Sequence, residues 1–422
     1  MEIVAASTQC AEAPGALSDY EFDLPAELIA QMPATERDGA RLLVLDRHSG
    51  HLEHSSVGML PEHLRPGDLL VVNDTRVIPA RIFGRTPSAA AIELLLIGPT
   101  PVDDTAASMN TLADEATEAD PPAACELALR RDLLRQSVRE GPSPSSSPAG
   151  SAGEESMSWS GAQGQLPCRW QCLGKPARRL RPGTQLTFAD GLRGVVTAVL
   201  GNGRYEVQFE SGSDVMAWLQ RHGEIPLPPY IRRPDGPLPT DHHRYQTIFA
   251  NAPGAIDAPT AGLHFTAGLV QALQERGIEL ARVTLHVGPA TFLPIRCADI
   301  RQHVMEPEWC AIPAETATAI RTAKADRRRV IAVGTTTTRT LESAACDEQI
   351  VQPGPRWADA FIVPGHRFRV VDALFTNFHL PGSTLLLLVS AFAGHTRTLA
   401  AYGEAVRQRY RFYSYGDAML IR

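Results

Sequence analysis

Short apolar stretches with β-branched or alternating residues follow one another between residues 68 and 209, and Gly, Pro or Asn separates them. This pattern is typical of short strands joined by turns, and it predicts a small antiparallel β-sandwich or β-barrel. The expected strands cover residues 68–73, 77–84, 92–97, 170–173, 184–188, 194–200 and 204–209. The Pro-rich residues 227–231 then predict a stiff exit linker.

Beyond the linker the pattern changes to strands alternating with helices. Thr266 is the expected N-cap of a helix over residues 267–276, which ends at Gly277 and precedes a strand over 279–287. A strand over 329–333 leads to a helix over 338–345. The alternation predicts an α/β main domain, built on a mixed sheet or a partly open barrel.

An expected helix over residues 25–31 and a strand over 41–46 would complete this α/β domain in space. The main domain is then discontinuous, with residues 18–68 and 228–422. Residues 69–227 form the inserted antiparallel β-barrel domain, and residues 1–17 form an N-terminal extension.

Residues 100–165 break the barrel pattern. They are acidic, contain the run GPSPSSSP at 141–148, and offer few apolar side chains beyond one expected helix at 125–138. Such a composition buries too little apolar surface to offset chain entropy. We therefore expect a low-complexity, disordered insert without a catalytic role.

The composition is that of an ordinary globular protein, with 44% hydrophobic and 21% charged residues. No apolar run approaches the roughly 20 residues that span a bilayer, and the first residues do not form a secretory signal. Seven scattered cysteines indicate reduced thiols and a cytoplasmic protein. Residues 100–167 carry the whole net charge of −7, so a neutral body remains that could bind RNA through local basic patches.

The motif VNDTRVIPAR at 72–81 leaves an apolar strand through three polar residues and delivers two arginines. Asn73, Asp74 and Thr75 are either turn formers or ligand contacts. Arg76 and Arg81 are candidates for binding phosphate or carboxylate.

Two histidines stand at chain junctions of the α/β domain. The motif APTAGLHF at 258–265 places small residues and His264 before a helix, and LHVG at 285–288 places His286 at the end of a strand. A lone histidine is more often structural. Two at positions where open α/β sheets bind ligands favour a site.

The motif VIAVGTTTTR at 330–339 is a strand, a glycine turn and a run of hydroxyls that opens a helix. This arrangement suits a phosphate or a carboxylate, although the threonines could also be N-caps. Neither the dinucleotide-binding fingerprint nor the P-loop is present. The motif TNFHLPGST at 376–384 is a second strand-to-helix junction, with Ser383 as the expected cap.

Basic residues cluster at two places near the predicted barrel. Such clusters are usually solvated faces, but they are also candidates for RNA contact. They are Lys175, Arg178, Arg179 and Arg181 within the barrel, and Arg232 and Arg233 at its exit.

In order, these segments resemble the S-adenosylmethionine:tRNA ribosyltransferase-isomerase family of queuosine biosynthesis. The resemblance begins at DYEFDLP (19–25) and RPGD (65–68) and continues through LPPYI (227–231), RYQT (244–247), PTAGLHF (259–265) and TLHVG (284–288). It ends with VGTT (333–336), TNFHLP (376–381) and SYGDA (414–418), and so covers the chain except about the first 17 residues and the insert.

The resemblance implies a two-domain transferase that moves and isomerises the ribosyl group of S-adenosylmethionine. The acceptor would be 7-aminomethyl-7-deazaguanine at the wobble position in the anticodon loop of a tRNA, and the products would be epoxyqueuosine, adenine and methionine. S-adenosylmethionine would be a consumed substrate, so no metal, no other cofactor, no membrane and no obligate protein partner are implied.

With this chemistry, His264 and His286 are the candidates for proton transfer. The remaining expected substrate contacts come from the motifs above. They are Asp74, Arg76, Arg81, Thr260, Gly262, Glu308, Gly334, Thr335, Thr336, Arg339, Asn377 and His379.

Three residues depart from the family pattern. Pro289 stands where glycine is usual after the His-Val pair, Glu306 replaces a histidine, and Asp257 stands where a small residue is common. Glu308 and His303 keep the pattern.

Two other functions remain open from the residues. A metal-dependent hydrolase could use His264, His286, His303 and His379, but no H-x-x-x-H or paired-cysteine spacing supports it. A non-catalytic RNA-binding protein would use the barrel and its arginines, and would leave the α/β motifs unexplained.

Overall fold

The computed structural model describes residues 15–100, 169–210, 214–234, 236–289, 295–347 and 350–422. The helix expected at 125–138, nearly all of the insert 100–165 and most of the extension 1–17 lie outside the described residues.

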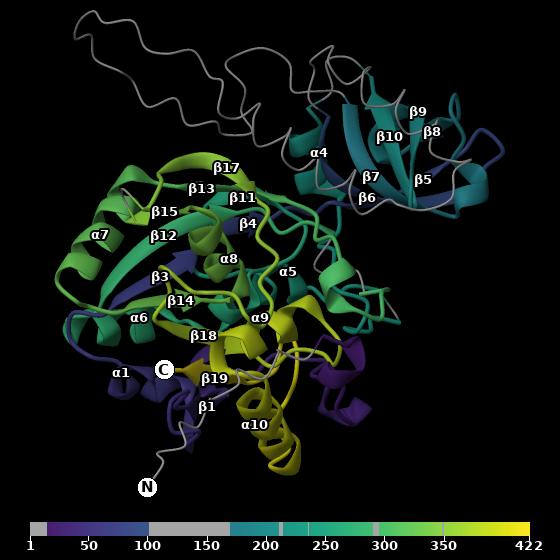
Figure 1. Cartoon of the computed structure of the whole chain (residues 1–422). Coiled ribbons are helices and arrows are strands. Elements are labelled where there is room, and N and C mark those ends of the chain that lie inside the picture. The colour runs from purple at the N-terminus through teal and green to yellow at the C-terminus, as the bar shows by residue number, and fades with distance from the viewer. Residues whose placement is uncertain (1–14, 101–168, 211–213, 235, 290–294, 348–349) are drawn as a thin grey trace, which may run out of the picture. The chain divides into compact units, whose positions relative to one another are not determined.

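A nine-stranded mixed sheet forms the main domain, as the alternating pattern predicted (Figure 1). The pairs β12–β3, β3–β14, β14–β18 and β1–β19 are parallel, and the other pairs are antiparallel. In order across the sheet the strands are β17 (Gly354–Ala358), β13 (Glu308–Ile312), β12 (Glu279–Leu285), β3 (Leu69–Asn73), β14 (Val330–Val333), β18 (Ala373–Asn377), β19 (Ala418–Ile421), β1 (Arg41–Leu45) and β2 (Leu52–Ser56).

Helices pack against both faces of this sheet. One core joins it to α7 (Ala314–Ala325), α8 (Thr335–Ser343), α9 (Thr384–Ala393) and α10 (His395–Arg407). The opposite core joins it to α1 (Leu60–His63) and α6 (Ala267–Glu275). The expected caps are confirmed, since the hydroxyls of Thr266 and Ser383 accept from the backbone N–H groups of Leu269 and Leu386 at 3.0 and 3.2 Å.

The predicted barrel is a closed ring of six antiparallel strands. Alternate side chains of each strand point into its core, and Trp218 and Leu219 of α4 (Val215–His222) belong to the same core. In order around the ring the strands are β10 (Arg204–Phe209), β7 (Arg169–Lys175), β6 (Ala91–Pro99), β5 (Arg81–Arg85), β8 (Gln185–Thr187) and β9 (Arg193–Gly201). Beside the two sheets lie β4 (Thr75–Val77), paired with β11 (Ala252–Ala255), β15 (Ala345–Cys346), paired with β16 (Ile350–Val351), and the single turn α5 (Asp241–Arg244).

Three sequence predictions are corrected. The barrel does not begin at residue 69, because β3 is buried throughout between β12 and β14, and the first barrel strand is β5. The helix expected at 25–31 is only a 3-10 turn, Ala26–Leu28, since backbone bonds between Leu28, Ala30 and Phe412 draw the chain into an extended path. Finally, α8 begins at Thr335 rather than 338, because Gly334, with φ of +93°, turns the chain directly into the helix.

The four described cysteines, Cys172, Cys297, Cys310 and Cys346, are free thiols. Within the described residues no single helix is long and apolar enough to cross a membrane. Only α9 and α10 taken together meet that length and composition, and a bend of 114° separates them.

Candidate functional site

The motifs of the α/β domain meet at the carboxyl ends of four neighbouring strands. Asn73 ends β3, His286 follows β12, Gly334 follows β14 and Asn377 ends β18. The carboxyl edge of an open parallel sheet is where α/β proteins bind ligands. The contacts of each side chain at this edge decide what it can do there.

Asn73 holds three elements together at this edge. Its Nδ2 donates to the Leu285 carbonyl at 3.0 Å and to the Thr336 hydroxyl at 3.3 Å, and its Oδ1 accepts from the N–H groups of Leu285 and Thr75. Sequence reasoning treated Asn73 as a turn former and missed this role. The available signal was a polar residue at the end of a wholly apolar strand.

Asp74 is a buried carboxyl beside Asn73. Its carboxylate accepts from the Thr284 hydroxyl at 2.7 Å, and burial raises the pKa of this carboxyl. Arg76, by contrast, is exposed and donates to the Ala250 carbonyl. Arg81 lies on the barrel strand β5 and is paired with Glu93 at 2.8 Å, so its contacts are those of the barrel rather than of the sheet edge.

His286 is nearly buried and has a stacked aromatic partner. Its ring lies parallel to that of Trp309, with centroids 4.9 Å apart and an interplanar angle of 15°. Its Nδ1 is 2.8 Å from the Thr75 hydroxyl. Burial lowers the pKa of His286 to about 4, so the imidazole is neutral at physiological pH.

His264 is also buried, in the 3-10 turn Thr260–His264. Asn377 Nδ2 lies 3.2 Å from its Nε2 and also donates to the Tyr413 carbonyl at 3.0 Å. The carbonyl fixes the orientation of the amide, so His264 Nε2 is an acceptor and its proton lies on Nδ1. Burial lowers the pKa of His264 to about 4.

The other members of these two motifs include an unsatisfied acceptor. Asn377 Oδ1 is buried and has no hydrogen-bond partner within the described part of the chain. A ligand donor could occupy it, since buried acceptors are seldom left unpaired. Gly262 leaves room for Thr247, whose methyl group would lie 2.9 Å from an added Cβ, and Thr260 is half-buried at the start of the turn.

The threonine run after β14 divides into two kinds of residue. The hydroxyls of Thr337, Thr338 and Thr340 donate to carbonyls four residues earlier at 2.8 to 3.1 Å, so they belong to α8 itself. Thr336 accepts from Asn73, and Thr335 is buried at the first position of the helix. Only these last two remain candidates for ligand contact.

Glu308 and Arg339 form a buried ion pair, and each side chain is 4% exposed. Arg339 also donates to the carbonyls of Glu306, Ala358 and Ala360, while Glu308 accepts from the Gly288 N–H at 2.8 Å. The pair thus joins α8 to β13 and to the backbone just after His286. Its contacts are those of a structural clamp, and substrate binding by either residue stays a prediction.

A narrow cleft beside this clamp brings together four of the predicted residues, Glu308, Thr335, Thr336 and Arg339, with apolar side chains that include Phe361 and Leu385. Its free volume is only about 20 Å³, so a nucleoside-sized ligand would have to displace lining side chains. His379 lies at the end of the neighbouring strand. Its Nε2 is 2.9 Å from the Thr376 hydroxyl, and burial lowers its pKa to about 3.

Two of the three departures from the family pattern have clear partners. Asp257 is buried and accepts from the Tyr245 hydroxyl and, at 2.9 Å, from the Ala258 N–H. Glu306 pairs with Arg204 of the barrel strand β10 at 2.5 Å. Pro289 is the last described residue before the gap at 290–294.

The predicted RNA contacts also divide. Arg178, Arg181 and Arg232 are exposed, and Lys175 is exposed although it pairs with Glu93. Arg179 is half-buried and donates to the Ala91 carbonyl at 2.7 Å. Arg233 forms a largely buried pair with Asp241, which assigns it a structural contact.

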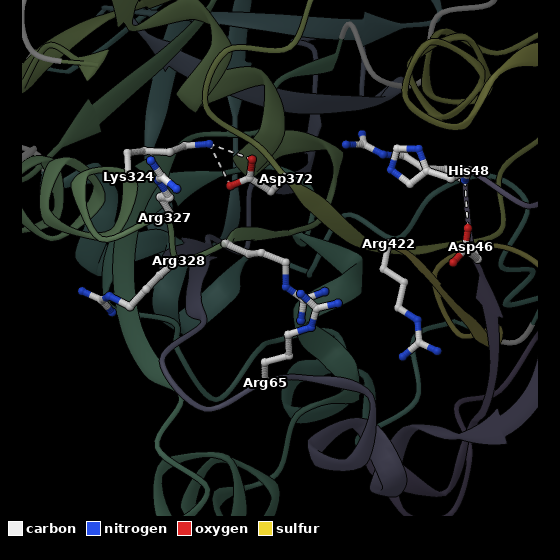
Figure 2. Close-up of a pocket in the computed structure, with 10 residues that line it drawn as sticks. Asp46, His48, Arg65, Lys324, Arg327, Arg328, Asp372 and Arg422 are labelled. Atoms are coloured by element: carbon white, nitrogen blue, oxygen red, sulfur yellow. Dashed lines mark hydrogen bonds and ion pairs between the residues drawn. The ribbon is translucent and has the colours of Figure 1, made fainter.

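A basic hollow lies at the amino ends of β3, β14 and β18, the opposite edge of the sheet from these motifs (Figure 2). Its volume is about 590 Å³. Local sequence did not reveal it, because its cations come from separate segments. They are Arg47, Arg65, Lys324, Arg327, Arg328, Arg329 and Arg422. Several have acidic partners, such as Asp372 for Lys324 and Asp68 for Arg329.

The histidines considered for a metal site are not gathered into one. Among the residues that the structure describes, no three His, Cys, Asp or Glu side chains form a group that could hold a metal ion.

Comparison with known proteins places this geometry in a family. Residues 17–421 match the family model described as "Queuosine biosynthesis protein". An S-adenosylmethionine:tRNA ribosyltransferase-isomerase of Trichlorobacter lovleyi is 43% identical over 96% of this chain and 99% of its own length, and one of Anaeromyxobacter dehalogenans is 45% identical over the same shares. A crystal structure of an S-adenosylmethionine tRNA ribosyltransferase from Thermotoga maritima is 31% identical, covers 96% of this chain and 100% of its own, and aligns with a TM-score of 0.46. The chain belongs to the queuosine biosynthesis protein family.

Proposed function

We propose that this protein is an S-adenosylmethionine:tRNA ribosyltransferase-isomerase. The observation that carries the proposal is the identity of 43 to 45% to enzymes of that name over 96% of this chain and 98 to 99% of the relatives. The substrates are S-adenosylmethionine and a tRNA.

The acceptor in this proposal is 7-aminomethyl-7-deazaguanine at the wobble position, in the anticodon loop. Its aminomethyl nitrogen gains the isomerised ribosyl group, which becomes the epoxycyclopentanediol ring of epoxyqueuosine. Adenine and methionine leave. S-adenosylmethionine is consumed as the ribosyl donor, and the proposal requires no separate cofactor.

The reaction needs a proton acceptor near the sulfonium, because the positive sulfur acidifies the adjacent 5′ carbon. His264 and His286 are kept neutral by burial, as a proton acceptor must be before it reacts. The pKa values near 4 make them weak bases in the resting protein. We propose that the sulfonium reaction nevertheless uses one of them, because a transfer to a neutral imidazole requires only that the carbon acid be aligned with it.

Three further side chains support a substrate position at this edge. The unpaired Asn377 Oδ1, which has no partner among the described residues, accepts a donor of the substrate, such as the ammonium or amino group of S-adenosylmethionine. Asp74, whose pKa is raised by burial, is a second carboxyl able to carry a proton near neutral pH. Thr335 offers a hydroxyl from the mouth of the cleft.

The test is a turnover assay with two labels. The purified protein is incubated with S-adenosylmethionine labelled in the ribosyl group and with tRNA that carries the aminomethyl base. We expect label to enter the tRNA as one adenine is released per modified base. Transfer of a methyl group, or tRNA binding without adenine release, contradicts the proposal. About one equivalent of tightly held zinc, with hydrolysis instead of transfer, would favour the metal-dependent hydrolase.

A further inference from the structure

We propose that His286, Trp309 and Trp357 form one aromatic row that stacks unpaired bases of the tRNA anticodon loop. This inference rests on the proposed function, because it names the surface that would present the loop to the carboxyl edge. The row runs across β12, β13 and β17, at the rim of the main sheet (Figure 1).

Strand register places the three residues side by side. Trp309 of β13 lies directly opposite Trp357 of β17 in an antiparallel pair. On its other side β13 pairs with β12, with Leu285 opposite Cys310, and the His286 N–H donates to the Trp309 carbonyl at 3.0 Å. Directly opposed residues point to the same face of a sheet, so both indoles lie on the face occupied by the His286 ring.

This face of the rim is open. Trp357 is 63% exposed, Pro355 beside it on β17 is exposed, and Trp309 and Ala311 of β13 are only half-buried. The alternate residues Glu308, Cys310 and Ile312 are buried on the opposite face, where Arg339 of α8 binds Glu308. The helix cover of these strands is therefore on one face, and the indoles lie on the other.

Exposed indoles next to a candidate catalytic imidazole favour a nucleic-acid base as the occupant. Proteins that read single-stranded loops splay the bases out and stack them on aromatic side chains. A base on Trp357 would continue the stack that Trp309 already forms with His286, with successive planes along one row. Arg282, an exposed cation on the same face of β12, is placed to meet a phosphate of the loop.

The row also fits the reaction geometry. It ends at His286, so a stacked loop would bring the modified base to the same edge as the proposed proton acceptor. The neutral state of the His286 ring suits this position, since a base can then approach without displacing a charged, hydrated group.

The experiment compares Trp357→Ala with two controls. Trp357→Phe keeps an aromatic face, and Phe83→Ala removes a different exposed aromatic, 48% exposed on the barrel. The probe is an anticodon stem-loop RNA carrying the aminomethyl base, and its Kd is measured by fluorescence anisotropy at fixed salt. The Kd for S-adenosylmethionine is measured for the same variants by calorimetry.

We expect Trp357→Ala to weaken stem-loop binding by roughly 5- to 150-fold, the loss of one base stack. Trp357→Phe should lose less, Phe83→Ala should match the wild type, and the Kd for S-adenosylmethionine should stay unchanged in all three. Stem-loop binding should also quench tryptophan emission in the wild type more than in Trp357→Ala.

Wild-type stem-loop affinity in Trp357→Ala would overturn the proposal. So would a fall in mass from dimer to monomer in that variant, which would make the row a contact between two copies of the chain. Failure of the proposed function has a different signature: the wild type binds and is quenched by the stem-loop yet releases no adenine.

Discussion

The most direct physical test of the buried network behind the site concerns Asp257. Its carboxyl is buried, and burial raises its pKa to about 7 although the Tyr245 hydroxyl and the Ala258 N–H both donate to it. Glu308 adds a smaller repulsion that acts in the same direction. Asp257 therefore keeps its proton in the folded protein at pH values where the unfolded chain has released it.

The sign of the effect on stability follows from proton binding. Between the unfolded pKa of 3.8 and the folded value of about 7, the folded state binds more protons than the unfolded state. Stability is unaffected by this group below that window and falls as the pH rises through it, by about 1.4 kcal/mol per pH unit. At pH 8 the cost is about 4 kcal/mol, and at pH 5 it is about 1.5 kcal/mol.

Asp257→Asn removes the ionisation and keeps an acceptor for both hydrogen bonds. The variant should be more stable than the wild type by up to about 4 kcal/mol at pH 8, and this advantage should shrink to about 1.5 kcal/mol at pH 5. Urea unfolding followed by tryptophan emission at pH 5, 6, 7 and 8 measures the difference. Asp326→Asn, at a carboxylate 56% exposed, is the matched control and should show no such trend.

Unfolding curves of wild type and Asp257→Asn that stay parallel from pH 5 to 8 would refute the reasoning. A trend of the same size in Asp326→Asn would refute it as well, because the effect would then not depend on burial.

Three further predictions concern the site and the RNA. His264→Ala and His286→Ala should each lower kcat by about 10² to 10⁴ and leave the Kd for S-adenosylmethionine within about tenfold; a stable variant that keeps the wild-type rate removes that histidine from the mechanism. Glu308→Gln leaves the buried guanidinium of Arg339 without its counter-ion, and should destabilise the fold by about 3 to 5 kcal/mol in urea unfolding; a change under about 1 kcal/mol would show that the pair is not a clamp. Neutralising the barrel patch should flatten the salt dependence of tRNA binding by about 0.7 to 0.9 for each phosphate that the protein no longer neutralises, and an unchanged slope would exclude the patch; the residues changed are Lys175, Arg178, Arg179 and Arg181.

The barrel was predictable because glycines, prolines and asparagines mark its turns and because its strands alternate strictly, as in β10. The strands β13 and β17 were not, since β13 opens on a buried Glu308 that reads as a surface residue. What neutralises that charge is Arg339, 31 residues away, and no local pattern announces such a pair. Chemistry-bearing motifs were thus located correctly at strand ends, while their partners depended on tertiary contacts.

The same dependence affected the role of individual residues. Arg233 and Arg339 have the sequence character of free phosphate-binding groups, yet each is turned inward onto a carboxylate. Asn73 has the character of a turn residue, yet it bonds to β12 and α8 at once. In each case, position along the chain indicated the right edge of the sheet, and packing decided what the side chain does there.

The place of β19 in the sheet has a consequence for folding kinetics. It lies between β18 and β1, and the Arg41 N–H donates to the Asp417 carboxylate, 376 residues further along the chain. Closing such a loop costs about 3 kcal/mol more entropy than closing a loop of about 10 residues. Proteins with such distant pairings fold slowly. We therefore expect the barrel, whose strands pair with near neighbours, to form early, and the pairing of β1 with β19 to be the slow step that completes the sheet.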